Sequence, residues 1–466
     1  MPKLQTIHFK WNFFIGVSSL LLFFGATASR AQSSPEVEGA VLPTPETRRG
    51  LKEFLELAET SGYELAESKA KVDFARARED FAKSYGLPRG NLDVIFGPIP
   101  GAQGNAVTGL TDWTRWGLFS ASKLEIMQPL YTFGALSSGR DAAQAGTEAE
   151  LKLAELARLK LRSSVAEYYY SYQLAFELSE LTADVASKLE QAIKSGEKLR
   201  AQGKRGAPSM ADLDKLYVLL TDIRVKEREA ITGMKLSKAA MAWKTGLYGR
   251  GDPRWDRANL VAQEIILKDL AYYQKIAAEK RPEMLALDFD VKAKKALVEV
   301  EEGLALPTFF VAGQATYAVA TKRTDQVSPF AYDPLNDQSA ALVLGFKWNL
   351  GFFERRAKLA QSRAELIAAQ ARRSHLGMAI LVDVEKSYLE LKQQVDSREA
   401  RKDATRAAKR VFNDALVAFT LGTGDGKSLL EALGSFGLAE KSRLETIAQS
   451  NIAIFKLAQA TGVLEL

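Results

Sequence analysis

The stretch LGTGDGKSLLEA, residues 421–432, contains Gly426-Lys427-Ser428, the ending typical of a loop that binds nucleotide phosphates. Such a P-loop has four residues between its two glycines, whereas Gly422 and Gly426 enclose three. A P-loop also follows a buried strand, whereas the charged, alanine-rich residues 398–420 favour a helix. We therefore interpret the stretch as a turn between two helices.

Other catalytic chemistry has little support in the sequence. The chain has no cysteine and two histidines, His8 and His375. Disulfides and thiol catalysis are thereby excluded, and a single histidine beyond the N-terminal segment argues against His-based catalysis and the usual transition-metal sites. His375 lies in a long helical pattern and is interpreted as an ordinary helix residue. We predict no enzyme, no catalytic residue, no cofactor and no metal site.

The N-terminus has the pattern of a secretory signal peptide. Lys3 and Lys10 precede the apolar residues 11–26, and small residues follow, so cleavage is expected after Ala28 or Ala31 and the signal peptide is assigned to residues 1–31. A retained anchor is the alternative, although residues 13–26 are short for a span of about 20 residues. Cleavage lowers the formal charge from +6 to +4, or to +3 if Arg30 also leaves, and no basic block indicates nucleic-acid binding.

Two long segments predict unusually long helices. Proline is absent between Pro129 and Pro208 and after Pro334. Within residues 142–201 and 355–420 the apolar residues recur at helical spacing, so each segment predicts a helix of about 60 residues, roughly 90 Å long. Such rods imply coiled-coil-like packing.

The two rods are copies at an offset of 219 residues. Pro88 and Gly203 recur as Pro307 and Gly422. The apolar stripe of the first rod recurs in the second: Leu161, Val165, Tyr169, Tyr172 and Phe176 become Ile380, Val384, Tyr388, Leu391 and Val395. The chain is therefore predicted to be an internal duplication, with a first repeat at 32–248, a connector at 249–280 and a second repeat at 281–466.

Each repeat also contains two segments with strand periodicity. Strands are expected at about 91–97 and 120–130, and at 308–319 and 340–350, with a long polar loop inside each pair. The order in each repeat is helix, strand, loop, strand, very long helix, turn, helix, with turns at about 202–210 and 420–428. The fold class is mostly α with β.

Four strands cannot close a membrane barrel, since known barrels begin at about eight strands. Several chains must pool their strands, and aromatic residues near the strand ends are candidates for an aromatic girdle: Trp113, Trp116, Tyr131, Phe330, Tyr332 and Trp348. The alternative is a periplasmic structural or adaptor protein in which helical hairpins carry no barrel.

Over most of its mature length the sequence resembles the TolC-like outer membrane efflux proteins, which are also called outer membrane factors. QPLYTFGALSSGRDAAQA and WNLGFFERRAKLAQSRAELIAAQ look like the family's strand-to-helix junctions, with Pro129, Gly134, Trp348 and Gly351 at the turns. Residues 281–309 resemble its RP-then-LP segment, and FTLGTGDGKSLLEAL resembles its turn between helices.

The resemblance implies a passive, homotrimeric export duct of a tripartite efflux or type I secretion system. Twelve strands would form an open barrel in outer-membrane lipid, and twelve helices would continue it as a periplasmic tunnel. An inner-membrane transporter and a periplasmic adaptor, or membrane fusion protein, would open it. Drugs, metal ions and unfolded polypeptides all stay open as cargo.

The resemblance also assigns candidate tip residues, although the match is partial. Ser428 and Glu431 occupy the family's two acidic positions, Gly424 stands at its basic latch position, and Phe419 is an aromatic latch without a hydroxyl. The candidate gate set is Asp212, Phe419, Asp425, Ser428 and Glu431, and the tip-turn glycines are Gly203, Gly206, Gly422, Gly424 and Gly426. The resemblance therefore implies a latch that is weaker, or one built from other groups such as Lys204, Arg205 or Asp425.

Two expectations follow for the tips. Ser428 is expected to cap the returning helix. Three copies of Asp212 or Glu431 around an axis would form an acidic ring that favours cations, and the alternative for either is an acid that the helix dipole favours near an N-terminus.

Overall fold

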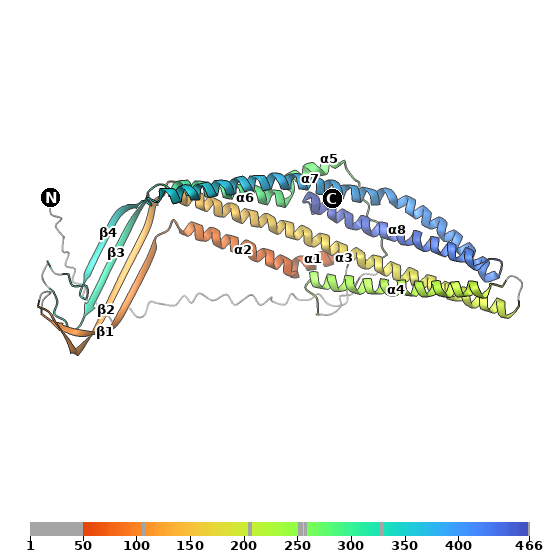
Figure 1. Ribbon diagram of the computed structural model, residues 1–466, viewed down its shortest axis with the longest axis horizontal. Helices are drawn as coiled ribbons and strands as arrows, with labels where there is room; N and C mark the ends of the chain where they lie inside the picture. Colours follow the sequence, from red (N-terminus) through yellow and green to blue (C-terminus); the bar gives the residue numbers. More distant parts are fainter. Residues whose placement is uncertain are drawn as a thin grey trace. The chain divides into compact units, whose positions relative to one another are not determined.

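The computed structural model describes residues 50–104, 108–203, 207–249, 255, 259–326, 330 and 332–464. The predicted signal peptide and its cleavage site lie outside these residues. The described part holds twelve elements (Figure 1): α1 (Leu51–Ser61), α2 (Tyr63–Ser84), β1 (Arg89–Gln103), β2 (Leu110–Tyr131), α3 (Ala135–Ala201), α4 (Met210–Lys244), α5 (Leu270–Lys280), α6 (Pro282–Leu304), β3 (Thr308–Ala320), β4 (Gln338–Lys347), α7 (Phe352–Leu421) and α8 (Gly426–Thr461).

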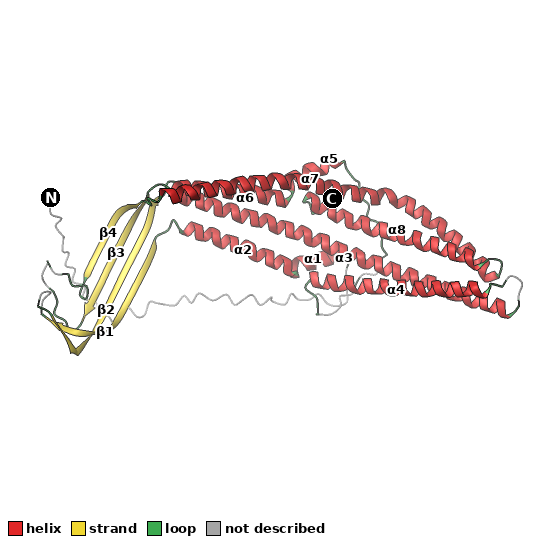
Figure 2. Cartoon of the chain, in the orientation of Figure 1, coloured by secondary structure: helices red, strands yellow, loops and turns green. Residues whose placement is uncertain are grey.

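The predicted fold class is confirmed: the described chain is mostly helical, with one four-stranded sheet (Figure 2). Each half contains a helix pair, two strands, one very long helix and a returning helix. The long helices α3 and α7 have 67 and 70 residues, so both extend a few residues beyond the predicted rods. Among the described residues no helix is long and apolar enough to cross a membrane.

The sheet is antiparallel throughout, in the order β1-β2-β3-β4. The prediction that residues 98–119 form a loop is wrong for most of that segment, because β1 continues to Gln103 and β2 begins at Leu110. Pro98 and Pro100, which fall in the segment predicted as a loop, lie in β1 opposite Leu118 and Trp116. β1 is an edge strand of the sheet in this chain, so a proline can occupy it without removing a hydrogen bond from a second neighbour.

The two faces of the sheet differ in polarity, as strand alternation requires. Across the polar face Asp93 lies opposite Lys123, and Lys123 lies opposite Thr316. Across the other face Leu92 lies opposite Leu124, and Leu124 lies opposite Ala315. The apolar side chains of the second face are largely exposed in this chain, Leu342 to 80%.

The helices pack through buried apolar stripes at helical spacing. α6 packs against both α3 and α7, whereas its counterpart α2 packs mainly against α3. At the far end from the sheet, Thr405, Phe412 and Phe419 of α7 are buried at intervals of seven residues, which is the spacing of a coiled-coil seam. Phe412 stacks on Phe436 of α8, with ring centroids 5.3 Å apart.

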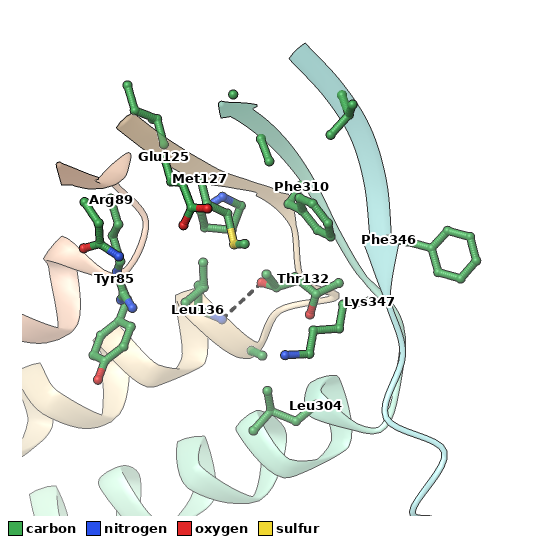
Figure 3. Close-up of a pocket in the computed structure, with 18 of the residues that line it drawn as sticks. Tyr85, Arg89, Glu125, Met127, Thr132, Leu136, Leu304, Phe310, Phe346 and Lys347 are labelled. Atoms are coloured by element: carbon green, nitrogen blue, oxygen red, sulfur yellow. Dashed lines mark hydrogen bonds between the residues drawn. The ribbon is translucent and has the colours of Figure 1, made fainter. Parts of the chain in front are cut away.

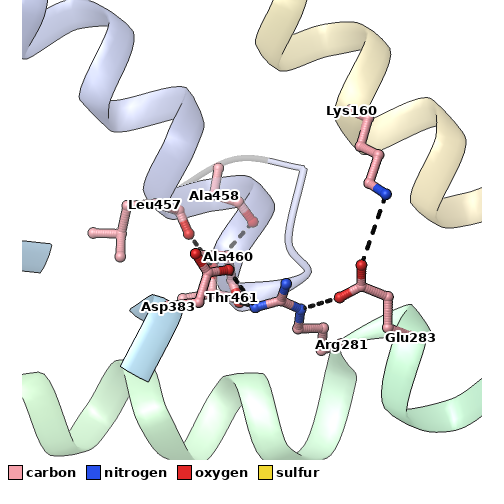
Figure 4. Close-up of polar contacts among 8 residues, drawn as sticks. All are labelled: Lys160, Arg281, Glu283, Asp383, Leu457, Ala458, Ala460 and Thr461. Atoms are coloured by element: carbon pink, nitrogen blue, oxygen red, sulfur yellow. Dashed lines mark hydrogen bonds and ion pairs between the residues drawn. The ribbon is translucent and has the colours of Figure 1, made fainter. Parts of the chain in front are cut away.

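Arg281, the arginine of the RP segment, connects three helices of the second repeat (Figure 4). Its guanidinium donates to Glu283 over 2.6 Å, to Asp383 of α7 over 2.8 Å and to the carbonyl of Ala460 in the last turn of α8 over 3.0 Å. The Arg281 side chain is 9% exposed. One buried cation therefore fixes α6, α7 and the end of α8 together.

Candidate functional site

The first tip, between α3 and α4, has a well-defined helix cap. Ser209 is the N-cap of α4, and its side chain accepts from the Asp212 backbone N–H over 3.1 Å. The Asp212 carboxylate in turn accepts from the Ser209 backbone N–H over 3.3 Å, which completes a capping box. Asp212, a predicted gate residue, therefore stabilises the start of α4 in this chain.

The second tip, between α7 and α8, corrects one expectation. The cap of α8 is Asp425 rather than Ser428: the Asp425 carboxylate accepts from the Ser428 backbone N–H over 2.6 Å. Asp425 comes three residues before Ser428, the distance at which an N-cap side chain reaches a free N–H. The hydrogen bond donated by the Ser428 backbone holds the pKa of Asp425 below its usual range.

Glu431 lies one turn into α8, on its exposed surface. Its side chain is 71% exposed and lies 3.8 Å from the Lys427 ammonium, four residues earlier. A pair this exposed contributes little to stability. The charges of Lys427 and Glu431 are therefore both available to solvent or to another chain.

The two tips meet within the chain. A side chain at Gly426 would place its Cβ 2.8 Å from the Cβ of Asp212, so the start of α8 lies directly against the first turn of α4. Phe419, the predicted aromatic latch, is fully buried, and its ring lies against Gly196 of α3. In this chain Phe419 is a core residue of the contact between the hairpins.

The predicted tip glycines differ in what they do. Gly203 and Gly422 have φ of 63° and 77°, values that favour glycine, and Gly422 is the C-cap of α7. Gly424 packs closely against Ala418, where a Cβ would lie 3.0 Å from the Ala418 Cβ. Gly206, Lys204 and Arg205 lie outside the described residues.

Of the four residues predicted at the strand-to-helix turns, Gly134, Trp348 and Gly351 lie at the junctions, whereas Pro129 lies inside β2. Gly134 is the N-cap of α3 with φ of 87°, and Gly351 is the N-cap of α7. Trp348 follows the end of β4 and its indole N–H donates to the carbonyl of Ala305, at the end of α6, over 3.0 Å. Pro129 lies at a register shift in the pairing of β2 with β3.

The predicted aromatic residues fall at both ends of the sheet. Trp113 and Trp116 form an edge-to-face pair at the hairpin end of β2, with centroids 6.2 Å apart, and Phe330 and Tyr332 lie in the loop between β3 and β4. Tyr131 and Trp348 lie at the helix end. All six side chains are well exposed, from 45% for Trp348 to 97% for Phe330.

The sequence reading missed three further rings at the helix end. Phe133 lies 4.7 Å from Tyr131 and 6.3 Å from Phe309, and Phe309 lies 6.0 Å from Phe346. Phe309 and Phe346 are cross-strand partners, which the alternation in β3 and β4 could have indicated once their register was known.

A second feature missed in the sequence is a stripe of exposed apolar residues along α7. Ile367, Met378, Leu389, Ala400 and Val411 recur every eleven residues, a period of about 3.67 residues per turn that keeps one line along a nearly straight helix. Met378, Leu389 and Val411 are 67%, 53% and 57% exposed. We call these residues the α7 stripe.

The α7 stripe has buried counterparts in α3. Subtracting 219 from Met378, Leu389 and Val411 gives Leu159, Tyr170 and Ala192. These are 6%, 5% and 0% exposed. Tyr170 packs on α8, where its ring lies 6.5 Å from that of Phe455. The same position of the repeat is thus covered in one half of the chain and open in the other.

The described residues contain no group of three or more His, Asp and Glu side chains that could hold a metal ion.

No single curated protein matches the chain in sequence. The model of the family described as outer membrane efflux protein matches residues 274–463, which run from within α5 to just beyond α8.

Solved structures share the fold over most of the chain. The outer-membrane channel OprN is 15% identical with a TM-score of 0.74, over 88% of this chain and 89% of its own. CusC is 15% identical with a TM-score of 0.72, over 90% of this chain and 94% of its own. The MtrE outer membrane channel of Neisseria gonorrhoeae, in its open state, is 15% identical with a TM-score of 0.70, over 89% of both chains.

These descriptions name channels and efflux proteins, which agrees with the prediction that the chain is not an enzyme. The predicted resemblance to the outer membrane efflux proteins is therefore confirmed as a match to that family's model over residues 274–463, and the chain shares the fold of the solved outer-membrane channels over most of its length.

Proposed function

We propose that the protein is a passive outer-membrane efflux duct, built as a ring of three copies of this chain. The observation that carries the proposal is the difference between equivalent positions of the two repeats. Leu159, Tyr170 and Ala192 are covered within the chain, while Met378, Leu389 and Val411 are exposed apolar residues. Within the chain, α8 packs against α3. A second copy of the chain that packed against α7 in the same way would cover Met378, Leu389 and Val411.

The opposite surface of the chain supports the same arrangement. Beyond the tips the repeat offset is 216 residues, as the equivalent hydrogen bonds of Thr245 and Thr461 show. The counterpart of Phe455 of α8, which packs on Tyr170, is therefore Ala239 of α4, an exposed residue one turn from Leu236. Leu236 is 66% exposed, and so are Phe74 and Phe81 of α2, to 65% and 63%. We infer that α7 of one copy contacts α4 and α2 of the next, so the interface is heterologous and closes into a ring.

The sheet supports the location in the outer membrane. Three copies would pool twelve strands, with the apolar face toward lipid, the polar face toward the lumen, and exposed aromatic rings at both ends. The duct carries out no chemistry, and an inner-membrane transporter with a periplasmic adaptor supplies the energy and engages the tips. A tripartite efflux system or a type I secretion system would both fit this arrangement.

The absence of cysteine makes the ring directly testable. In a chain carrying Leu236→Cys and Leu389→Cys, a short thiol-reactive cross-linker should join different copies and give a trimer band, and electron microscopy of the sample should show a threefold ring. Either single variant should give mostly monomer, because the two positions meet each other and not themselves. Val417→Cys with Leu236→Cys is the control, since Val417 and its counterpart Lys198 are both exposed.

Fractionation separates this proposal from the rival adaptor reading. The duct requires the protein in the outer-membrane fraction and detergent for its extraction, together with conductance in planar bilayers. A freely soluble periplasmic protein without cross-linked trimers would instead favour the helical-hairpin adaptor.

A further inference from the structure

A groove of about 1240 Å³ lies where the polar face of the sheet meets the helix ends (Figure 3). The sheet supplies one side, and α2, α3 and α6 supply the other through residues such as Tyr85, Leu136 and Leu304. Phe346, also at the edge of the groove, points away from it toward the apolar face. The groove is therefore formed by the side of the sheet that alternation makes polar.

The floor of the groove is nevertheless apolar. The ring of Phe310 lies across the neighbouring strand at Gly345, where a Cβ would come within 2.9 Å of the Phe310 ring. The glycine lets the ring lie flat on the sheet, and Met127, Ala312 and Val343 continue the apolar surface on either side. This floor interrupts the polar face just above the helix ends.

The charge of the groove is positive. Its charged lining residues are Arg89, Glu125 and Lys347. The Glu125 carboxylate lies 2.5 Å from the Lys123 ammonium on the same face, so its charge is balanced. Arg89 lies over the ring of Tyr85, 4.0 Å from its centroid, and the Lys347 side chain points into the groove (Figure 3).

The backbone does not change this sign. α3 begins at the groove, whereas α2 and α6 end at it, so the helix dipoles leave a partial negative charge of about half a unit, smaller than the two positive charges of Arg89 and Lys347. Arg89 stands on the first strand and Lys347 on the last, three strand spacings or about 14 Å apart across the sheet. Because Arg89 is level with Val343, the two are also four residues, or about 13 Å, apart along the strands. Between them lies the apolar floor.

We propose that this groove binds amphipathic anions, holding an acidic head group at Lys347 or Arg89 and an apolar body of roughly ten carbon atoms on the Phe310 floor. The proposal rests on the proposed function in placing the groove inside the duct, and it names the class of cargo that the wall retains. The charge complementarity selects the anion: a cationic amphiphile would meet the same floor with two like charges at its ends.

The test uses purified full-length protein in lipid nanodiscs and a dansyl-labelled undecanoate, whose fluorescence rises in an apolar site. Matched probes carry an alcohol or an ammonium in place of the carboxylate, and empty nanodiscs give the background. The carboxylate should saturate a site and bind more tightly than the alcohol, with the ammonium weakest. Lys347→Gln and Arg89→Gln should each weaken its binding about threefold to fivefold. Lys358→Gln, on the exposed surface of α7, should leave binding unchanged.

Two further variants protect the test from misfolding. Glu125→Gln frees Lys123 and should tighten anion binding, which a damaged protein would not do. Phe310→Ala removes the floor and should weaken all three probes together. Equal binding of the three probes to the wild type, or unchanged carboxylate binding in the Lys347→Gln, Arg89→Gln double variant, would overturn the proposal.

Conductance of the same samples separates the two proposals. If the protein conducts as a trimer but shows no preference for the anionic probe, the proposed duct stands and the proposed anion-binding groove is wrong. A protein that prefers the anion but neither conducts nor forms trimers retains the groove and loses the duct.

Discussion

The ring of Tyr170 on α3 lies 6.5 Å from the ring of Phe455 on α8. The repeat-equivalent of Tyr170, Leu389, is exposed, and so are Ala239, the repeat-equivalent of Phe455, and Leu236 one turn from it. The positions equivalent to this internal contact are therefore exposed on both α7 and α4. We attach the first prediction to this pair.

Leu389→Asp should destabilise the trimer, because it places a charge where we infer an apolar contact between copies. The effect should appear as a lower trimer fraction in detergent by light scattering, and Leu236→Lys in the same chain should restore part of it. Val417→Asp, on the exposed side of the same helix, is the control. Equal trimer fractions in the Leu389→Asp and Val417→Asp variants would remove the support for this interface.

Asp212 can be tested for a gate role separately from its role as a cap. Asp212→Ala loses the capping box and should cost about 1 kcal/mol of stability. Asp212→Gln keeps a side chain that a capping box accepts but removes the charge. If three Asp212 carboxylates form an acidic ring, Asp212→Gln should relieve block of single channels by divalent cations with little change in thermal stability. If divalent cations block the Asp212→Gln channel as they block the wild type, Asp212 acts only as a helix cap. Glu431→Gln, measured in the same way, tests whether Glu431 forms the acidic ring instead.

Gly426→Ala should loosen the contact between the two tips, because its Cβ would lie 2.8 Å from the Asp212 Cβ. Relief of such a clash typically costs about 1–3 kcal/mol. Trypsin should cleave after Lys427 faster than in the wild type, since that side chain is already 79% exposed. Gly434→Ala, where no atom lies near the added Cβ, is the matched control and should not accelerate cleavage.

Arg281→Ala should be strongly destabilising, by about 3 kcal/mol, because it leaves Glu283 and the Ala460 carbonyl without their buried donor. Arg281→Lys keeps the charge but not the fork of donors, so it should be intermediate. Thermal unfolding of the detergent-solubilised protein measures both. Arg363→Ala removes an exposed pair with Glu302 and should change stability by less than about 1 kcal/mol.

The cap of α8 should depend on pH. The pKa of Asp425 is lowered in the folded chain by the hydrogen bond from the Ser428 backbone. A carboxyl group with a depressed pKa contributes stability that is complete above its unfolded value, near 3.9, and is lost as the pH falls through the lower folded value. Hydrogen exchange at the start of α8 should therefore be slower in the wild type than in Asp425→Ala at pH 7, and the difference should shrink toward pH 3. A constant difference at all pH values would show that the carboxylate charge is not what caps the helix.

The sequence alone determined the periodic features of this protein. The helical spacing without proline predicted α3 and α7, because nothing in those segments breaks a helix. The shared landmarks Pro88 and Pro307, and Gly203 and Gly422, revealed the duplication. The order of the motifs carried the resemblance, which the family match supports over residues 274–463.

Tertiary structure decided the features that depend on distant neighbours. Residues 98–119 were predicted as a polar loop, but most of them extend β1 and β2, and Pro98 and Pro100 are accommodated because β1 is an edge strand of the sheet in this chain. Ser428 was expected to cap α8, yet the capping side chain is fixed by where the helix begins, and it begins at Gly426. Burial separates Leu159 from Met378 although their positions in the repeat are the same, since exposure is set by the element on the other side. The groove below the sheet likewise exists only once Phe310, Lys347 and the ends of α3 and α6 are brought together.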